Sequence, residues 1–204
     1  MLFRSGAFIA ELFSPFDFEG ITLTYPDETF SGETEVRVGD KRARLIEVGP
    51  AHTRGDTLVH LPEERVVYTG DILFVEGTPI AWAGPVSHWI AALDRILAMD
   101  VELVVPGHGP VTDKDGVRAM RGYLDYITDA ARRRYDRGLS PLEAAFDIAL
   151  GDYAAWADAE RLVVNVQTLY DEVGGAEQAH DPVPFFGQIQ EVRGHLQGAG
   201  GAAG

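Results

Sequence analysis

Three short loops of this sequence each carry one side chain of a kind that binds transition metals. The loops read AHTRGD, YTGD and PGHGP, and they contribute His52, Asp71 and His108. Each loop follows or precedes a run typical of a β-strand, and loops at strand ends let a rigid sheet aim side chains at a common point. Two imidazoles and one carboxylate suit zinc, iron(II) or manganese(II). We therefore expect the three side chains to cluster on loops at one edge of a sheet.

Each of these residues also has a common structural role. His52 and His108 match solvated or hydrogen-bonded polar residues in turns, and Asp71 matches an Asx-type turn at the end of a strand. Taken one at a time, the structural role is the more frequent one. Glycines near each polar side chain would let the backbone approach a bound metal closely, but the choice between a metal site and three unrelated turns depends on the resemblance described below.

Short strands and one helix must position these loops. The run 34–38 is the clearest strand, because Val36 and Val38 alternate with Glu35 and Arg37 in the manner of a half-buried strand. A helix is predicted over 86–99, where Trp89, Leu93, Ile96 and Leu97 form one apolar stripe. Strands are predicted at 21–25, 34–38, 43–48, 57–61, 65–71 and 101–105, and a short helix at 2–13.

The second half of the chain predicts helices rather than strands. They are expected near 114–138, from Ser140 to Gly151, and over 155–172, with Ser140, Pro141 and Glu143 forming a helix start. The chain therefore divides into a β-rich portion (1–113), a helical region packed on it (114–175) and a tail (176–204). The tail ends in QGAGGAAG and is expected to be partly disordered. The fold class is α+β.

Composition limits the partners and the chemistry. The chain has 204 residues, 46% of them hydrophobic, which allows a sizeable core. A net charge of −15 disfavours nucleic acid and anionic membranes as partners. There are no cysteines, so a metal site must use His, Asp or Glu. No apolar run approaches the roughly 20 residues of a membrane span, and no signal peptide is evident, so we expect a cytoplasmic protein.

The three loops, read as HTRGD, YTGDILF and VVPGHGPV, resemble the second, third and fourth metal motifs of the metallo-β-lactamase superfamily. The resemblance implies that His52 binds one metal, that His108 binds another, and that Asp71 bridges the two. It implies an αβ/βα sandwich with one or two zinc ions that activate water and polarise a carbonyl or ester. The expected function is hydrolysis of a small ester, thioester, lactone or amide.

One departure from the family pattern affects both fold and activity. The first motif of the family, His-x-His-x-Asp-His, has no counterpart, because no histidine precedes His52. We therefore expect an incomplete sandwich that lacks the family's N-terminal half, as a truncated product or a fragment. Each metal would keep one histidine and the shared Asp71, so weak binding is expected. One metal held by all three residues is the other arrangement, and it requires the two histidines to converge. The alternative is a non-catalytic remnant that needs the missing segment or a homodimer.

Three further residues are candidates near the site. Asp56 is expected either to hydrogen-bond its own loop or to support a metal ligand. Trp82 and His88 follow Asp71 and are expected to border a substrate pocket. Core packing is the common alternative for Trp82, and a solvated helix turn is the alternative for His88. His60, inside the run TLVHL, is interpreted as a structural residue on a strand face.

Overall fold

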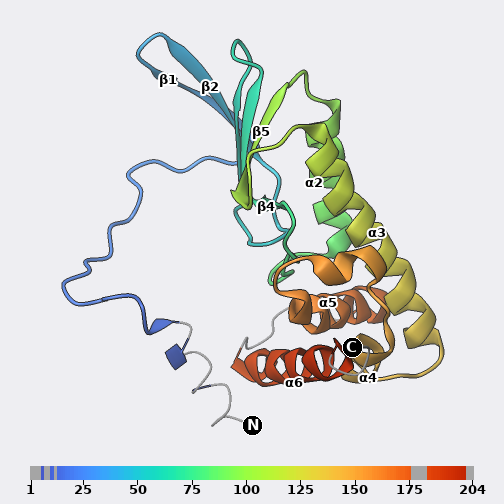
Figure 1. Cartoon of the computed structure of the whole chain (residues 1–204). Helices are drawn as coiled ribbons and strands as arrows, with labels where there is room; N and C mark the ends of the chain where they lie inside the picture. Colours follow the sequence, from blue (N-terminus) through green and yellow to red (C-terminus); the bar gives the residue numbers. More distant parts are fainter. Residues whose placement is uncertain (1–5, 7–9, 12, 176–182, 201–204) are drawn as a thin grey trace.

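The fold is built on one five-stranded mixed sheet (Figure 1). The computed structural model describes residues 6, 10, 11, 13–175 and 183–200. The strands lie in the order β1-β2-β3-β4-β5; β1 to β4 pair antiparallel, and β5 pairs parallel to β4. They are β1 (Glu33–Val38), β2 (Lys41–Glu47), β3 (Thr57–Leu61), β4 (Val66–Phe74) and β5 (Leu103–His108).

Helices lie along one side of this sheet and extend below it (Figure 1). Helix α2 makes the crossover that a parallel pair of strands requires, here between β4 and β5. In the described part of the chain, no helix is long and apolar enough to cross a membrane. The helices are α2 (Val86–Ala98), α3 (Lys114–Asp136), α4 (Pro141–Asp147), α5 (Leu162–Gly174) and α6 (Val183–Gly200), with short 3-10 turns η1 (Gly151–Ala155) and η2 (Ala159–Arg161).

The predicted apolar stripe of α2 is confirmed. Trp89, Leu93 and Ile96 are fully buried, and each such side chain contributes roughly 1.5–3 kcal/mol through removal of apolar surface from water. The Trp89 indole also donates a 2.8 Å hydrogen bond to the backbone oxygen of Ile72. Because Ile72 follows Asp71 directly, this bond ties α2 to the part of β4 that carries the candidate metal ligand.

Five of the six predicted strands are present, and four of these have shifted ends. The strand expected at 101–105 begins at Leu103 and continues to His108. The run 21–25 forms no strand: Ile21 and Leu23 are exposed, and no strand lies beside them among the described residues. An isolated run of high β-propensity has no ladder to join, and propensity alone does not stabilise a strand. Most of the helix expected at 2–13 lies outside the described residues.

The helices of the second half follow the sequence with two differences. Helix α3 and the start of α4 are as predicted, including a capping box between Ser140 and Glu143. Helix α4 ends at Asp147, before the predicted Gly151, and the last predicted helix begins at Leu162 after the turn η2. These ends reflect weak local signals, since helix boundaries depend on tertiary packing.

The segment predicted as a tail contains helix α6. Its Phe185, Ile189 and Val192 are buried against the helical core, which supplies the stability that a glycine-rich sequence lacks locally. Residues 176–182 and 201–204 of the predicted tail lie outside the described part. The α+β class and the helical C-terminal region are confirmed.

The face of the sheet opposite the helices is apolar. Strand pairing places Leu45, Val59, Tyr68 and Val105 on this face, because partners in register point the same way. No helix covers this face in the described part of the chain (Figure 1). The Tyr68 side chain at its centre is 44% exposed. Contiguous apolar surface of this kind is typical of an interface or of an aggregation-prone region.

We expect the isolated chain to self-associate through this apolar face. The change Tyr68→Lys should reduce association, because it places a charge at the centre of the face. Sedimentation velocity over a concentration series measures the effect. Val173→Lys, on α5, is a matched control at another exposed apolar side chain and should leave association unchanged. A compact monomer at every concentration would contradict this expectation.

His60 makes the stability sensitive to acid. Its side chain is buried on the helix-covered face, and neither ring nitrogen has a hydrogen-bond partner among the described residues. Burial lowers the pKa of His60, and the cross-strand Arg44 lowers it further, against weaker opposite effects of Asp100 and Glu63. In the unfolded chain, His60 takes up a proton near its ordinary pKa of about 6.5, whereas in the folded chain it does so only at lower pH. The free energy of unfolding therefore falls as the pH drops below about 6.5.

We expect His60→Leu to reduce this acid sensitivity, because leucine fills a similar space without a titrating group. The measurement is urea unfolding of the metal-free wild type and variant at pH 7.5 and pH 5.5. The loss of unfolding free energy between the two pH values should be smaller in the variant. Equal losses in both proteins would assign the acid sensitivity to other groups.

Candidate metal centre

Asp71 lies between the two predicted histidine ligands. Its Oδ2 is 3.4 Å from Nε2 of His52, and its Oδ1 is 3.4 Å from Nε2 of His108. The structure thus brings together all three residues singled out by their loops. Each carboxylate oxygen faces a different imidazole. A carboxylate in this arrangement could bridge two neighbouring metal positions.

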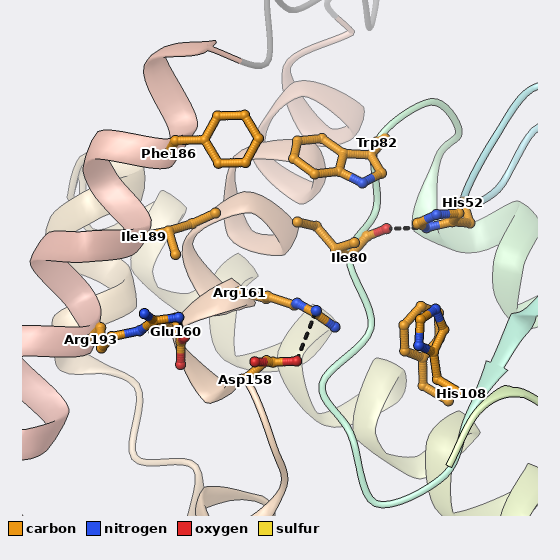
Figure 2. A pocket seen from close by; sticks show the side chains of 11 residues that line it. His52, Ile80, Trp82, His108, Asp158, Glu160, Arg161, Phe186, Ile189 and Arg193 are labelled. Atoms are coloured by element: carbon orange, nitrogen blue, oxygen red, sulfur yellow. Dashed lines mark hydrogen bonds and ion pairs between the residues drawn. The ribbon is translucent and has the colours of Figure 1, made fainter. Parts of the chain in front are cut away.

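The hydrogen bonding of His52 defines its tautomer. Its Nδ1 lies 2.7 Å from the backbone oxygen of Ile80, drawn as a dashed line in Figure 2. A carbonyl oxygen only accepts, so Nδ1 carries the proton, and in the neutral ring Nε2 has a lone pair. That lone pair faces a carboxylate oxygen of Asp71, which is also an acceptor. A cation between these two acceptors would bind both, and metal-bound histidines are oriented by this type of carbonyl contact.

His108 is fixed by the end of β5 and by an aromatic contact. Its ring stacks on Phe74, with centroids 4.3 Å apart and planes at 11°. Its backbone oxygen accepts a 3.0 Å hydrogen bond from the amide of Val75. Both contacts come from the end of β4, so the strand that carries Asp71 also orients His108.

Glycine at position 107 is required by the close approach of the two strands. A Cβ added at Gly107 would lie 2.3 Å from Oδ1 of Asp71 and 2.6 Å from the carbonyl carbon of Gly70. Any larger residue would push the carboxylate away from His108. The glycine before the histidine in VVPGHGPV therefore has a direct steric explanation.

The loop of His52 is held by Asp56. This carboxylate is buried and accepts hydrogen bonds from the backbone amide and the hydroxyl of Thr53, at 2.9 and 2.6 Å. Of the two roles considered for Asp56, the structure shows the bond within its own loop. That bond shapes the turn directly after His52.

Residues 79–81, which include the Ile80 carbonyl that contacts His52, are hydrogen-bonded to α5. Asn165 is buried, and its side chain accepts from the amide of Ala81 at 2.9 Å and donates to the oxygen of Pro79 at 2.9 Å. The Thr168 hydroxyl donates to the oxygen of Ala81 at 2.8 Å. The carbonyl of Ile80, between these contacts, is thereby held in place for His52.

A cavity of about 260 Å³ adjoins both histidines. Trp82 lies in its wall, as the sequence predicts (Figure 2). His88 does not: it is exposed on α2 and lines a separate depression with Ala91 and Arg95. The buried Trp89 faces the core, and adjacent residues on a helix point about 100° apart, so His88 is turned away.

Several residues of the cavity wall are absent from the sequence predictions. One part is apolar, another part is charged, and both include residues of α6, for which no helix is predicted. The wall consists of His52, Phe74, Ile80, Trp82, His108, Asp158, Glu160, Arg161, Phe186, Ile189 and Arg193. Only an amphipathic pattern in the glycine-rich tail would have indicated the α6 residues, and that pattern is weak.

The three candidate residues offer donor atoms of the types that zinc binds, but too few of them for a usual zinc site. An imidazole nitrogen and a carboxylate oxygen are ordinary zinc donors, but catalytic zinc usually has three protein ligands, and each position beside Asp71 has two. Across the described residues, no group of three or more His, Cys, Asp or Glu side chains is arranged to hold a metal ion. The geometry thus favours two half-built positions sharing Asp71 over one ion held by all three residues.

The family of the chain is established by comparison with known proteins. Residues 4–108 match the family model of the metallo-beta-lactamase superfamily, and the chain belongs to this superfamily. It is similar to the linear primary-alkylsulfatase of Pseudomonas sp., with 26% identity over 146 residues. It is also similar to the hydroxyacylglutathione hydrolase of Brucella anthropi, with 26% identity over 161 residues.

These relatives are longer than the chain. The match covers 66% of the chain and 27% of the alkylsulfatase, and 74% of the chain and 61% of the hydroxyacylglutathione hydrolase. The fold agrees with the sec-alkylsulfatase Pisa1 from Pseudomonas sp., at a TM-score of 0.60 and 15% identity over 74% of the chain and 27% of that structure. A metallo-beta-lactamase family protein from Thermus thermophilus gives a TM-score of 0.57 and 18% identity, over 76% of the chain and 52% of that structure.

We expect zinc to raise the melting temperature through Asp71. At about 100 times its dissociation constant, zinc would add roughly 2.7 kcal/mol of stability, and each kcal/mol is about 2–4 °C for a chain of this size. Asp71→Ala should abolish the shift, because both positions lose their shared oxygen ligand. The shift should shrink in acid, where protonated imidazole cannot bind metal. The measurement is a melting scan with and without zinc.

Asp129→Ala is the matched control for this experiment, since Asp129 is an exposed carboxylate on α3. It should retain the zinc shift. An equal shift in wild type, Asp71→Ala and Asp129→Ala would place zinc elsewhere on the acidic surface.

Proposed function

We propose that His52, Asp71 and His108 are metal ligands of a hydrolase that acts on a small ester, thioester, lactone or amide. The observation that carries the proposal is Asp71, whose two oxygens face Nε2 of the two histidines. Bound zinc would supply an activated water and polarise the bond to be cleaved. The relatives named as an alkylsulfatase and a hydroxyacylglutathione hydrolase favour hydrolysis over other metal chemistry.

The residues of the chain prepare this site in three ways. His52 presents Nε2 because Ile80 holds its other nitrogen, and His108 is held in plane by Phe74. The carboxylate of Asp71 would offset the positive charge of a metal ion bound beside either histidine. The adjoining cavity gives a small molecule access to both imidazoles, which form part of its wall.

The second candidate is a chain that is not catalytic alone and binds metal weakly. Two observations favour it: each metal position has two protein donors, and one sheet face is apolar and bears no helix in the described region. In this case a homodimer or a further segment would complete the structure, and the small-molecule site would be latent.

The experiment is a hydrolysis assay with one ester, one thioester, one lactone and one amide substrate, on protein stripped of metal and then given zinc. We expect zinc to restore hydrolysis of at least one bond type. Loss of a residue that only hydrogen-bonds a metal ligand typically lowers activity about 10–100-fold. Because Asp71 is proposed as a ligand itself, Asp71→Ala should lower kcat/KM by at least that much. Asp129→Ala should match the wild type.

Hydrolysis that persists without metal, or is equal in Asp71→Ala, would reject the proposed site. Zinc binding through Asp71 without hydrolysis of any of the four bond types would favour the second candidate.

A further inference from the structure

The cavity beside the histidines has an apolar side and a charged side. Trp82, Phe186 and Ile189 form the apolar side, whereas Asp158 and Arg161 lie across from them, toward His108 (Figure 2). At about 260 Å³ it lies just below the usual size of small-molecule sites. The division suits a ligand with one charged group and one apolar group.

Arg161 has hydrogen-bonding capacity to spare. One terminal nitrogen pairs with Oδ2 of Asp158 at 2.8 Å, and the other donates to the oxygen of Thr78 at 3.1 Å. Within the described residues, these contacts use two of the five N–H groups of a guanidinium. The side chain is 27% exposed, and Arg161 is one of the residues that line the cavity. A planar guanidinium binds carboxylate and sulfate groups well because its donors match two oxygens at once.

The other arginine of the cavity is engaged differently. Both Nε and a terminal nitrogen of Arg193 donate to Oε1 of Glu160, whose side chain is nearly buried. Glu160 is thereby neutralised where it meets the cavity. Arg161 is paired with Asp158 through one terminal nitrogen, and its guanidinium keeps N–H groups that neither Asp158 nor Thr78 uses.

Arg161 is placed by rigid backbone rather than by a loose loop. Ala157 bridges to Gly77, with reciprocal backbone bonds from Ala157 to Glu76 at 3.0 Å and from Thr78 to Ala157 at 2.8 Å. The guanidinium also lies over the ring of Phe74, 6.0 Å from its centroid, and Phe74 stacks on His108. The cation is therefore held on the same aromatic ring as a candidate metal ligand.

We propose that this cavity binds an organic anion with a short alkyl chain, with the anion on Arg161 and the chain against Trp82, Phe186 and Ile189. That such an anion is the substrate of the hydrolase rests on the proposed function. That the cavity binds such an anion does not. The net charge of −15 opposes anions in general, so selective binding requires a local cation of this kind.

The test is calorimetric titration of metal-free protein, in the presence of a chelator, with octanoate and octyl sulfate. Octanol and octylamine are the neutral and cationic controls. Both anions should bind more tightly than either control. A series from butyrate to octanoate should strengthen binding by up to about fourfold per methylene, the effect of burying apolar surface.

Variants assign the two parts of the site. Arg161→Gln should weaken octanoate binding about tenfold or more, the effect of losing a charge-assisted hydrogen bond, while Arg161→Lys should retain most of it. Arg118→Gln, on the exposed face of α3, is the matched control and should bind as the wild type does. Trp82→Ala should reduce the gain per methylene without removing anion selectivity.

Three results would overturn the inference: octanol binding as tightly as octanoate, no binding of either anion, or no difference between Arg161→Gln and Arg118→Gln. Because the titration uses metal-free protein, its outcome is independent of zinc binding and hydrolysis. Anion binding without hydrolysis would support this site while rejecting the proposed function. Hydrolysis without anion selectivity would do the reverse.

Discussion

The parallel pairing of β4 with β5 is the constraint on which the site depends. Asp71 and His108 lie on these two strands, and the register sets Gly70 opposite Pro106 and Phe74 opposite His108. A slip of one residue would reverse the direction of every side chain on one strand. The register is secured by the crossover helix, whose Trp89 packs in the core and bonds to the backbone of β4. The candidate metal ligands are thus placed by the same packing that makes the core.

A single extended segment, residues 78–81, connects the candidate metal ligand His52 to the cavity. The oxygen of Thr78 accepts from Arg161, the oxygen of Ile80 accepts from His52, and Asn165 of α5 holds the stretch between and after them. Helix α5 therefore does more than cover the sheet. By holding Pro79 and Ala81 it also positions the carbonyl of Ile80, which orients the His52 ring. Displacement of α5 would change the cavity wall and the tautomer-defining bond of His52 together.

The sequence predicted that His52, Asp71 and His108 lie together, because ordered motifs identify which segments meet even when distance along the chain is large. It was wrong in placing all three on loops, since Asp71 lies within β4 and His108 is the last residue of β5. It predicted the buried stripe of α2 for a simpler reason, since helical periodicity is local. It did not predict the loss of the strand at 21–25 or the presence of α6. Both depend on neighbours: the first run has none to pair with, and α6 is stabilised by burial of residues such as Ile189. The position of Arg161 in the cavity follows from these same tertiary contacts, so local patterns could not show it.

The crossover between β4 and β5 also bears on how the chain folds. Asp71 and His108 lie on these two strands, so they face each other only when β5 is paired beside β4. Parallel pairing across a helix closes a long loop, a step that is slow compared with forming a hairpin such as β1–β2. The hairpins of the sheet can therefore assemble while the histidine pair is still separated. An ion bound by both Asp71 and His108 would therefore report that β4 and β5 are paired.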